Sequence, residues 1–372
     1  MANHSTCVIP DMRCDEVFSG LLQSRRYPFL DIAKGIGAFL VVLGHNWITI
    51  YGSDELFRVI FSFHVPLFFF LSGVLFDCTN GFKVLVLRKL DSILKPYVCI
   101  LAAWGIVEII FKRIPVWDYY LGVFYSSGRT ITLTPLWFLP HLFLVFMFSW
   151  FICKLHPVLN RSPQGLVVLV AALLVGGVCT IDVFWGEDVQ YTSKLLPVSD
   201  ASLFQLGLPF SADIVLVTSA FFLAGHYSAE RIVTFRPNWN SLVLSILGFA
   251  FLHATYDITL DLNMRRYDHI VLSTAQAALG IYVVLSFSKL IPFSGAIGHS
   301  LAYVGSGSLF VLLFHTFFQG RLFSLFNVFS SDAPYLSAIA ALFFSVVSSL
   351  LVWELVKRIP LLTAVLLPAK SR

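Results

Sequence analysis

The side chains best suited to chemistry in this chain begin with Asp31, Lys34 and His45, which lie within one mostly apolar stretch, residues 29–50. A stretch of about 20 such residues is long enough to cross a bilayer as a helix. A charged side chain in mid-span costs about 2.5–3.5 kcal/mol, so we expect these three side chains to face the protein interior.

The spacing of these residues supports that expectation. Lys34 and His45 are 11 residues apart, which on a helix leaves them about 20° from the same face and roughly 16 Å apart along the axis. Asp31 lies one turn before Lys34 and can neutralise its charge. The stretch therefore predicts a polar stripe with a cation near one membrane face and an imidazole in the other half.

An imidazole has an unperturbed pKa of about 6.5, so His45 could accept a proton from a hydroxyl group at neutral pH. The same nitrogen could instead carry an acyl group covalently. His64 lies in the next apolar stretch, two residues before Pro66. A proline inside a span frees a backbone carbonyl, and the kinked region can line a cavity. We expect His64 to face His45 and orient it or a substrate; an interhelical hydrogen bond is the alternative.

Composition decides the class of protein. The chain has 372 residues, of which 58% are hydrophobic and 12% charged, and its apolar runs leave no room for a soluble domain of ordinary size. The six cysteines are scattered, without a CxxC pair, so we expect neither a metal site nor a disulfide framework. Residues 1–28 form a polar tail without a recognisable signal peptide.

The apolar runs predict an all-α membrane protein, a polytopic bundle of about ten transmembrane helices. An even number of spans puts both termini on one side. The connections on that side hold 16 Lys and Arg residues against eight on the other, which predicts cytoplasmic termini. Residues 357–372 then form a basic tail, with the apolar run 359–368 lying along the membrane surface. The predicted spans are residues 29–51, 57–76, 91–111, 136–153, 166–181, 209–225, 240–256, 269–288, 300–320 and 336–356.

This orientation puts Lys34 near the cytoplasmic face and His45 in the outer half of the bilayer. It also puts two similar segments, FFFLSGVLF at 68–76 and FFLAGHYSAE at 221–230, at the cytoplasmic ends of inward-running spans. Glycine at such positions allows close helix packing. Ser72 and Gly73 are interpreted in the same way, because no GxSxG elbow surrounds them. Most of the acidic residues at 257–268 are expected to be solvated.

Four segments resemble the acyltransferase 3 family of bacterial membrane acyltransferases, and the resemblance covers nearly the whole chain. LDIAKGIGAFLVVLGH at 30–45 and FSFHVPLFFFLSGVLF at 61–76 are specific together, whereas TPLWFLPHLFLVF at 134–146 and SLFVLLFH at 308–315 add weaker support. Many members carry Arg where this chain has Lys34. The charge is kept, but the bidentate fork for phosphate is lost.

The resemblance implies an O-acetyltransferase that takes acetyl groups from cytoplasmic acetyl-CoA and modifies hydroxyls of an exopolysaccharide, a lipopolysaccharide or a lipid-linked sugar. It implies a catalytic role for His45, as general base or acyl carrier, and a donor-binding role for Lys34. We expect Asp31 to orient Lys34 and Arg88 to help bind the CoA phosphates. A purely structural ion pair of Lys34 with Asp31 is the alternative.

We expect Trp137, His141 and His315 to line the acceptor pocket, although each could instead pack in the core. The acyltransferase domain then covers residues 29–356 in the bacterial inner membrane. Its expected partners are the sugar or polysaccharide acceptor, membrane lipids and glycan-assembly proteins, with no nucleic acid and no metal.

Two other functions fit parts of the pattern. A transporter or flippase of a sugar precursor also needs a polar path through ten helices, but inverted halves with matching broken helices are not evident. A haem-binding electron carrier could use outer-half histidines on different helices as iron ligands.

Overall fold

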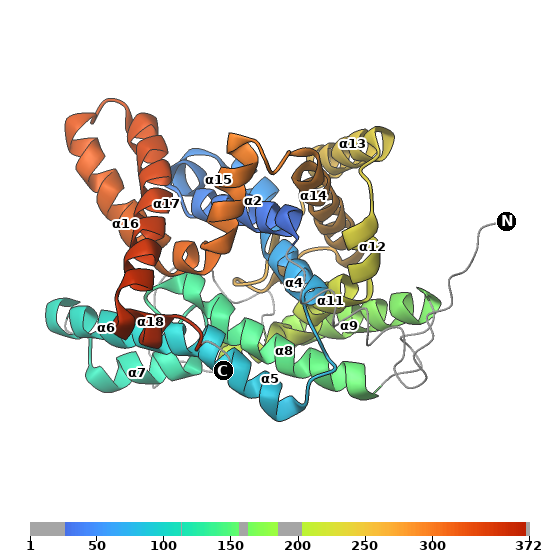
Figure 1. The fold of residues 1–372 in the computed structure, drawn as a ribbon, viewed down its shortest axis with the longest axis horizontal. Helices are drawn as coiled ribbons and strands as arrows, with labels where there is room; N and C mark the ends of the chain where they lie inside the picture. The colour runs from blue at the N-terminus through green and yellow to red at the C-terminus, as the bar shows by residue number, and fades with distance from the viewer. Residues whose placement is uncertain (1–26, 113, 156–162, 185–202, 370–372) are drawn as a thin grey trace.

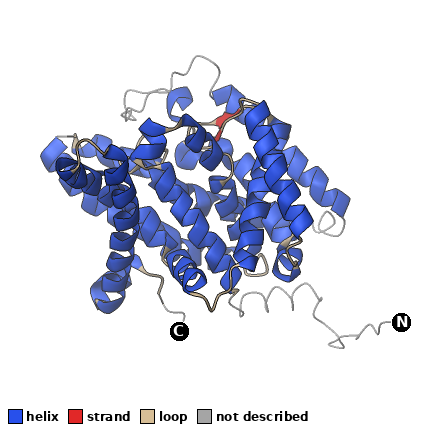
Figure 2. Ribbon diagram, turned by 90° about the horizontal axis from the view of Figure 1, so that it is seen from above, coloured by secondary structure: helices blue, strands red, loops and turns tan. Residues whose placement is uncertain are grey.

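The computed structural model describes residues 27–112, 114–155, 163–184 and 203–369. Within these residues the chain is helical almost throughout, which confirms the predicted all-α class (Figure 2). The exception is a short antiparallel hairpin, β1 (Leu260–Asp261) with β2 (Arg266–Tyr267). The predicted N-terminal tail, residues 1–28, lies almost entirely outside the described residues.

Eight helices in the described part of the chain are long and apolar enough to cross a membrane. They correspond to eight of the ten predicted spans. The other two predicted spans contain α2 (Pro28–Gly44) and α13 (Trp239–Thr255), which have 17 residues each. The number of ten spans therefore stays a prediction. The eight helices are Asp54–Val74, Phe82–Lys112, Thr134–Leu155, Gln164–Phe184, Pro209–Tyr227, Ile270–Leu290, Ser308–Phe329 and Pro334–Arg358.

Several helices start where their sequences provide a cap. Ser53 accepts a hydrogen bond from the backbone N–H of Leu56, and Asn238 caps α13 in the same way. Pro28 occupies the first turn of α2, where its missing N–H costs no helical hydrogen bond. The remaining elements are η1 (Ile48–Gly52), α3 (Asp54–Phe61), α4 (His64–Val74), α5 (Phe82–Lys89), η2 (Leu90–Leu94), α6 (Lys95–Lys112), α7 (Val116–Tyr125), η3 (Thr134–Trp137), α8 (Phe138–Leu155), α9 (Pro163–Phe184), α10 (Leu203–Leu206), η5 (Pro209–Ile214), α11 (Val215–Tyr227), α12 (Ala229–Thr234), α14 (Ile270–Leu290), α15 (Ala296–Ser306), α16 (Ser308–Phe329), α17 (Pro334–Arg358) and α18 (Pro360–Leu366).

The helices form a broad layer with two helix pairs above it (Figure 1). Helices α5 to α9 run along the lower side of that view. The pair α16 and α17 stands at one end, and the pair α13 and α14 stands at the other. Between the pairs lie α2, α4, α11 and α15, which make the central contacts of the molecule.

Glycines let the central helices approach closely. A Cβ atom on Gly73 of α4 would overlap the carbonyl oxygen of Phe222 on α11, and one on Gly225 of α11 would overlap the carbonyl oxygen of Phe70 on α4. The two similar segments of the sequence therefore pack against each other. Helices α2 and α15 cross through a second pair, in which Gly35 faces Leu301 and Gly305 faces Asp31.

Several predicted spans are interrupted. The first, residues 29–51, is α-helical only to Gly44, where His45 is the C-cap, and the π-helical turn η1 follows from Ile48. The second breaks at Ser62 and Phe63, between α3 and α4, because Pro66 in the first turn of α4 has no N–H to continue the helical bonding from residue 62.

The sixth predicted span has a kink at Phe210 and Ser211 before α11 begins. The ninth, predicted as one helix over 300–320, is divided at Gly307 into α15 and α16.

The C-terminal segment packs on the bundle. Leu366 of α18 is buried against Phe310 and Val356. Lys95 donates a hydrogen bond to the backbone carbonyl of Leu367, and the backbone N–H of Ala369 donates to Asp91. The run 359–368 is too short to span the membrane, as predicted, but it also closes the end of the bundle beside α6.

The hairpin region holds buried charges. Arg265 and Asp213 form an ion pair of 2.8 Å with both side chains fully buried. Asp257 is exposed, as expected, but Asp261 is buried. Burial raises the pKa of Asp261 to about 6, although the backbone N–H of Met264 donates to its carboxylate.

Candidate active site

Helices α2 and α4 lie against each other in opposite directions, and glycines fix their register. The Cβ position of Gly37 lies 3.0 Å from the ring of Phe68 on α4, and that of Gly44 lies 3.1 Å from the ring of Phe61 at the end of α3. Continuing this register brings Lys34 level with Ser72 and brings His45 within about one turn of His64.

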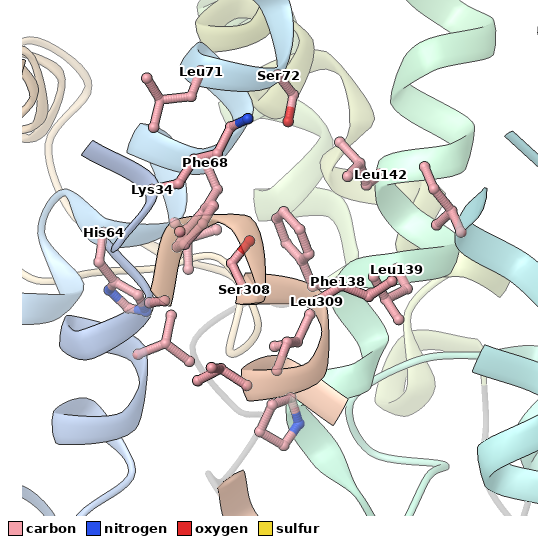
Figure 3. Close-up of a pocket in the computed structure, with 18 of the residues that line it drawn as sticks. Lys34, His64, Phe68, Leu71, Ser72, Phe138, Leu139, Leu142, Ser308 and Leu309 are labelled. Atoms are coloured by element: carbon pink, nitrogen blue, oxygen red, sulfur yellow. The ribbon is translucent and has the colours of Figure 1, made fainter. Parts of the chain in front are cut away.

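These side chains share one cavity of about 490 Å³ (Figure 3). Its volume falls within the roughly 300–1,000 Å³ that is typical of ligand pockets. Five residues singled out from the sequence are in its lining, namely Asp31, Lys34, His45, His64 and Trp137. The other lining residues are Ala38, Val41, Val65, Phe68, Leu71, Ser72, Ser92, Ile93, Pro135, Phe138, Leu139, Leu142, Gly305, Ser306, Ser308, Leu309, Val311 and Leu312.

One end of the cavity is cationic. The Lys34 ammonium lies 3.8 Å from the Asp31 carboxylate, and Lys34 and Ser72 lie together at the end of the cavity opposite His64 in Figure 3. Lys89 of α5 is near enough for its charge to interact with Lys34, and its ammonium stacks 3.6 Å from the centre of the Phe146 ring. Its neighbour Arg88 is exposed outside the cavity.

The other end carries two imidazoles. Nδ1 of His45 lies 2.8 Å from the carbonyl oxygen of Val41, and Nδ1 of His64 lies 2.8 Å from that of Ile60. A carbonyl oxygen only accepts hydrogen bonds, so each Nδ1 carries the proton. Each Nε2 then keeps its lone pair, which is the form needed by a general base or a nucleophile. The Phe61 ring contacts both imidazoles.

The imidazole ring of His315 packs against that of His45. Their rings meet edge to face, with 5.3 Å between centroids, and Nδ1 of His315 donates to the carbonyl oxygen of Val311. The side chain is fully buried, and its Nε2 has no hydrogen-bond partner among the described residues. His315 is not part of the lining of the cavity, so its position differs from that expected of an acceptor-binding residue.

His141 is also held away from the cavity. Its Nδ1 hydrogen-bonds the carbonyl oxygen of Phe210, and its Nε2 lies 2.9 Å from the hydroxyl of Thr218. Both ring nitrogens have partners within the protein, and His141 is buried and is not among the residues that line the cavity. It packs behind Trp137, whose indole does line the cavity.

The sequence analysis missed four serines in the lining. Ser72 was interpreted as a packing position, but its neighbour Gly73 makes the close contact with α11 while Ser72 borders the cavity. Ser92 lies in the π-helical turn η2. Ser306 and Ser308 flank the break at Gly307, and the run Gly-Ser-Gly-Ser at 305–308 was the signal that could have located it.

The arrangement combines a binding end with a reactive end. Lys34 can hold an anionic or polar group, while the Nε2 atoms of His45 and His64 can accept protons elsewhere in the same cavity. The walls between them are mostly apolar and come from α4, α8 and α16. Apolar walls exclude water and strengthen polar interactions inside the cavity.

Comparison with known protein families identifies the family of this chain. A family model described as an acyltransferase domain matches residues 27–354. No curated protein and no solved structure matches the chain.

Proposed function

This chain belongs to the acyltransferase family whose model spans residues 27–354, and we propose that its donor is cytoplasmic acetyl-CoA and its acceptor a sugar hydroxyl. It is a multi-pass membrane acyltransferase. The proposed acceptors are an exopolysaccharide, a lipopolysaccharide or a lipid-linked sugar, and the proposed location is the bacterial inner membrane. The family match favours this enzyme over the transporter and the haem protein.

One observation supports the proposal above the others. Lys34, Asp31, His45 and His64 all line the same cavity, and Figure 3 shows Lys34 beside Ser72 and away from His64. The CoA phosphates would bind near Lys34, Lys89 and Arg88, and the flexible arm of CoA would extend along the apolar walls. The thioester would then lie near His45, where the acceptor hydroxyl enters from the other side of the membrane.

His45 acts as the general base in the proposed reaction. Its Nε2 accepts the proton of the sugar hydroxyl while the hydroxyl oxygen bonds to the thioester carbonyl carbon. When the tetrahedral intermediate collapses, the carbon–sulfur bond breaks and the CoA thiolate takes the proton from the imidazolium. General-base catalysis of this kind contributes roughly 10²- to 10⁴-fold. The Nδ1–H bond to Val41 keeps the ring in the required tautomer.

The test is acetyl transfer by the purified full-length protein in lipid nanodiscs. Labelled acetyl-CoA is supplied with extracted surface glycans, and glycan mass spectra from cells with and without the gene identify the acceptor. We expect His45→Gln to lower the transfer rate at least about 100-fold while insertion is unchanged. His299→Gln is the matched control, because His299 is exposed on α15 outside the cavity.

A His45→Gln protein that transfers acetyl groups at the normal rate would overturn the role of His45. A wild-type protein that hydrolyses no acetyl-CoA and adds no acetyl mass to any glycan would overturn the proposed donor and acceptor. If His45 instead carries the acetyl group, a peptide containing His45 gains the mass of one acetyl group in the absence of acceptor.

A further inference from the structure

Three metal-binding side chains lie together at the ends of three helices. Cys78 follows α4, Cys153 lies in the last turn of α8, and His226 lies in the last turn of α11. Their ligand atoms all lie within 4.8 Å of one another, and no other group of three such residues in the described part of the chain is as close. Both cysteines are free thiols.

The close packing of α4 on α11 explains why they meet. Gly73 and Gly225 let these helices approach until their backbones touch. Cys78 comes five residues after Gly73, and His226 directly follows Gly225. Helix α8, which also packs on α11, brings Cys153 to the same place. Sequence spacing gave no sign of this group because its members are 75 and 73 residues apart.

The distances between the ligand atoms are close to those in a metal site. Sγ of Cys78 lies 3.8 Å from Nε2 of His226. In a tetrahedral zinc site with bonds of about 2.3 Å to sulfur and 2.0–2.1 Å to nitrogen, a sulfur and a nitrogen ligand are roughly 3.6 Å apart. Small side-chain adjustments would therefore let the three atoms share one ion.

The surroundings suit a cation held by thiolates. Cys153 is buried, and the hydroxyl of Tyr227 donates to its sulfur at 3.5 Å. The His226 ring packs on Phe76, with 5.3 Å between centroids. The C-terminal ends of α8 and α11 direct the negative ends of their dipoles toward the group. Cys78 and His226 are only half-buried, so an ion could reach them from solvent.

We propose that Cys78, Cys153 and His226 bind one Zn²⁺ ion, with water as the fourth ligand. Two thiolates and an imidazole are ligands that zinc prefers, whereas Mg²⁺ and Ca²⁺ prefer oxygen. Binding releases both thiol protons to solvent and leaves a site with no net charge. The ion joins the ends of α4, α8 and α11. Because α4 and α8 also carry walls of the cavity, the ion stabilises the cavity from outside it.

The test measures zinc on the purified full-length protein, prepared in detergent without chelators. Elemental analysis gives zinc per chain, and competition with a coloured chelator gives the affinity for added Zn²⁺. We expect one ion per chain, and affinity at least about tenfold lower in Cys78→Ser, Cys153→Ser and His226→Gln. Cys99→Ser is the matched control, because Cys99 is a half-buried thiol on α6 outside the group, and it should bind zinc normally.

Two further measurements do not depend on the folding of a ligand variant. Co²⁺ added to the wild-type protein should produce the charge-transfer absorption of thiolate-bound cobalt. Tyr227→Phe, which keeps all three ligands but removes the hydroxyl, should weaken zinc binding about tenfold. None of these measurements involves acetyl transfer. They therefore test the zinc site independently of the proposed donor and acceptor.

Several results would contradict the proposed zinc site. One is a wild-type protein that binds zinc no more tightly than the Cys78→Ser/Cys153→Ser double variant. Another is a wild-type cobalt spectrum that lacks thiolate charge transfer. A third is a Cys78–Cys153 disulfide in protein purified under reducing conditions, because both sulfur ligands would then be consumed.

Discussion

Three histidines share one arrangement of the imidazole ring: His45 and His64, which line the cavity, and His315 of α16. In His45, His64 and His315 the Nδ1–H donates to the carbonyl oxygen four residues earlier. This bond uses a backbone acceptor of the same helix, so it fixes the tautomer without a carboxylate partner. The basic nitrogen of each ring is therefore Nε2, and the two that line the cavity are available to a substrate.

In the proposed reaction, Lys34 is the residue whose charge would bind the donor. Replacing it with Met keeps its length but removes the ammonium, whose hydrogen bonds to an anion contribute about 1.5–3 kcal/mol. We expect the KM for acetyl-CoA to rise roughly 10- to 100-fold, with a smaller change in Lys34→Arg because the charge is retained. Lys83→Met, on the exposed face of α5, is the control. An unchanged KM in Lys34→Met would support the structural ion pair with Asp31.

Asp261 makes stability depend on pH. Its folded-state pKa of about 6 exceeds the ordinary value of 3.8 because it is buried. The folded state therefore holds a proton that the unfolded state has lost, and stability falls as pH rises from about 4 to about 6. Asp261→Asn keeps an oxygen for the Met264 N–H and removes this loss. Each pKa unit corresponds to about 1.4 kcal/mol, so the variant gains up to about 3 kcal/mol over wild type at pH 7.

Thermal unfolding of the wild type and of Asp261→Asn from pH 4 to pH 7 measures this difference. Asp257→Asn is the control, because Asp257 is exposed. Parallel stability curves for wild type and Asp261→Asn would contradict the prediction.

Contacts between helices depend on single glycines. The sequence showed two similar segments, each with a glycine at the same place, and predicted that they pack closely. It could not show that they pack on each other, because hydrophobic patterns locate a helix but do not identify its neighbour. Gly73 and Gly225 make that pairing, and no side chain larger than hydrogen fits at either contact.

Gly225→Ala tests the contact between α4 and α11. Its Cβ would overlap the backbone oxygen of Phe70, which cannot move without shifting the helix. Overpacking of this kind costs about 1–3 kcal/mol or more, so we expect a lower Tm and a lower yield of monodisperse protein. Gly320→Ala is the matched control, because nothing lies within 4 Å of its Cβ position. Equal Tm values for the two variants would contradict this account.

Breaks within helices were harder to predict than the helices themselves. Hydropathy averaged over a span is insensitive to one interrupted turn, so the predicted span 300–320 concealed the division at Gly307. That break supplies Ser306 and Ser308 to the cavity. The shared cavity position of Lys34 and His45 was predictable because Lys34 lies on α2 and His45 is the C-cap of the same helix. The serines come from segments far apart in the sequence, and only the folded structure brings them together.

For the whole molecule, the distribution of Lys and Arg predicts the orientation in the membrane. The predicted cytoplasmic segments hold twice as many Lys and Arg residues as the others, 16 against eight. We expect a green fluorescent protein fused after Arg372 to fluoresce. Alkaline phosphatase fused after Ser331, between α16 and α17, should be active. Active phosphatase at Arg372 together with inactive phosphatase at Ser331 would reverse the orientation, and with it the side from which acetyl-CoA enters.

Fold class was predictable from composition, and the spacing of Lys34 and His45 predicted that both face the interior, where they line one cavity. The group of Cys78, Cys153 and His226 was not predictable, because its members belong to three distant segments. The position of His141 was not predictable for the same reason. The sequence predicted that it lines the acceptor pocket, whereas its ring nitrogens hydrogen-bond Phe210 and Thr218.

The residues that line the cavity range from Asp31, near the start of the chain, to Leu312, in its last quarter. During synthesis the N-terminal helices leave the ribosome first. Helices α2 and α4 thus enter the bilayer before α15 and α16 exist to cover them. Until translation passes Gly307 the cavity lacks the lining residues of α16, so a prematurely terminated chain would not have a complete cavity.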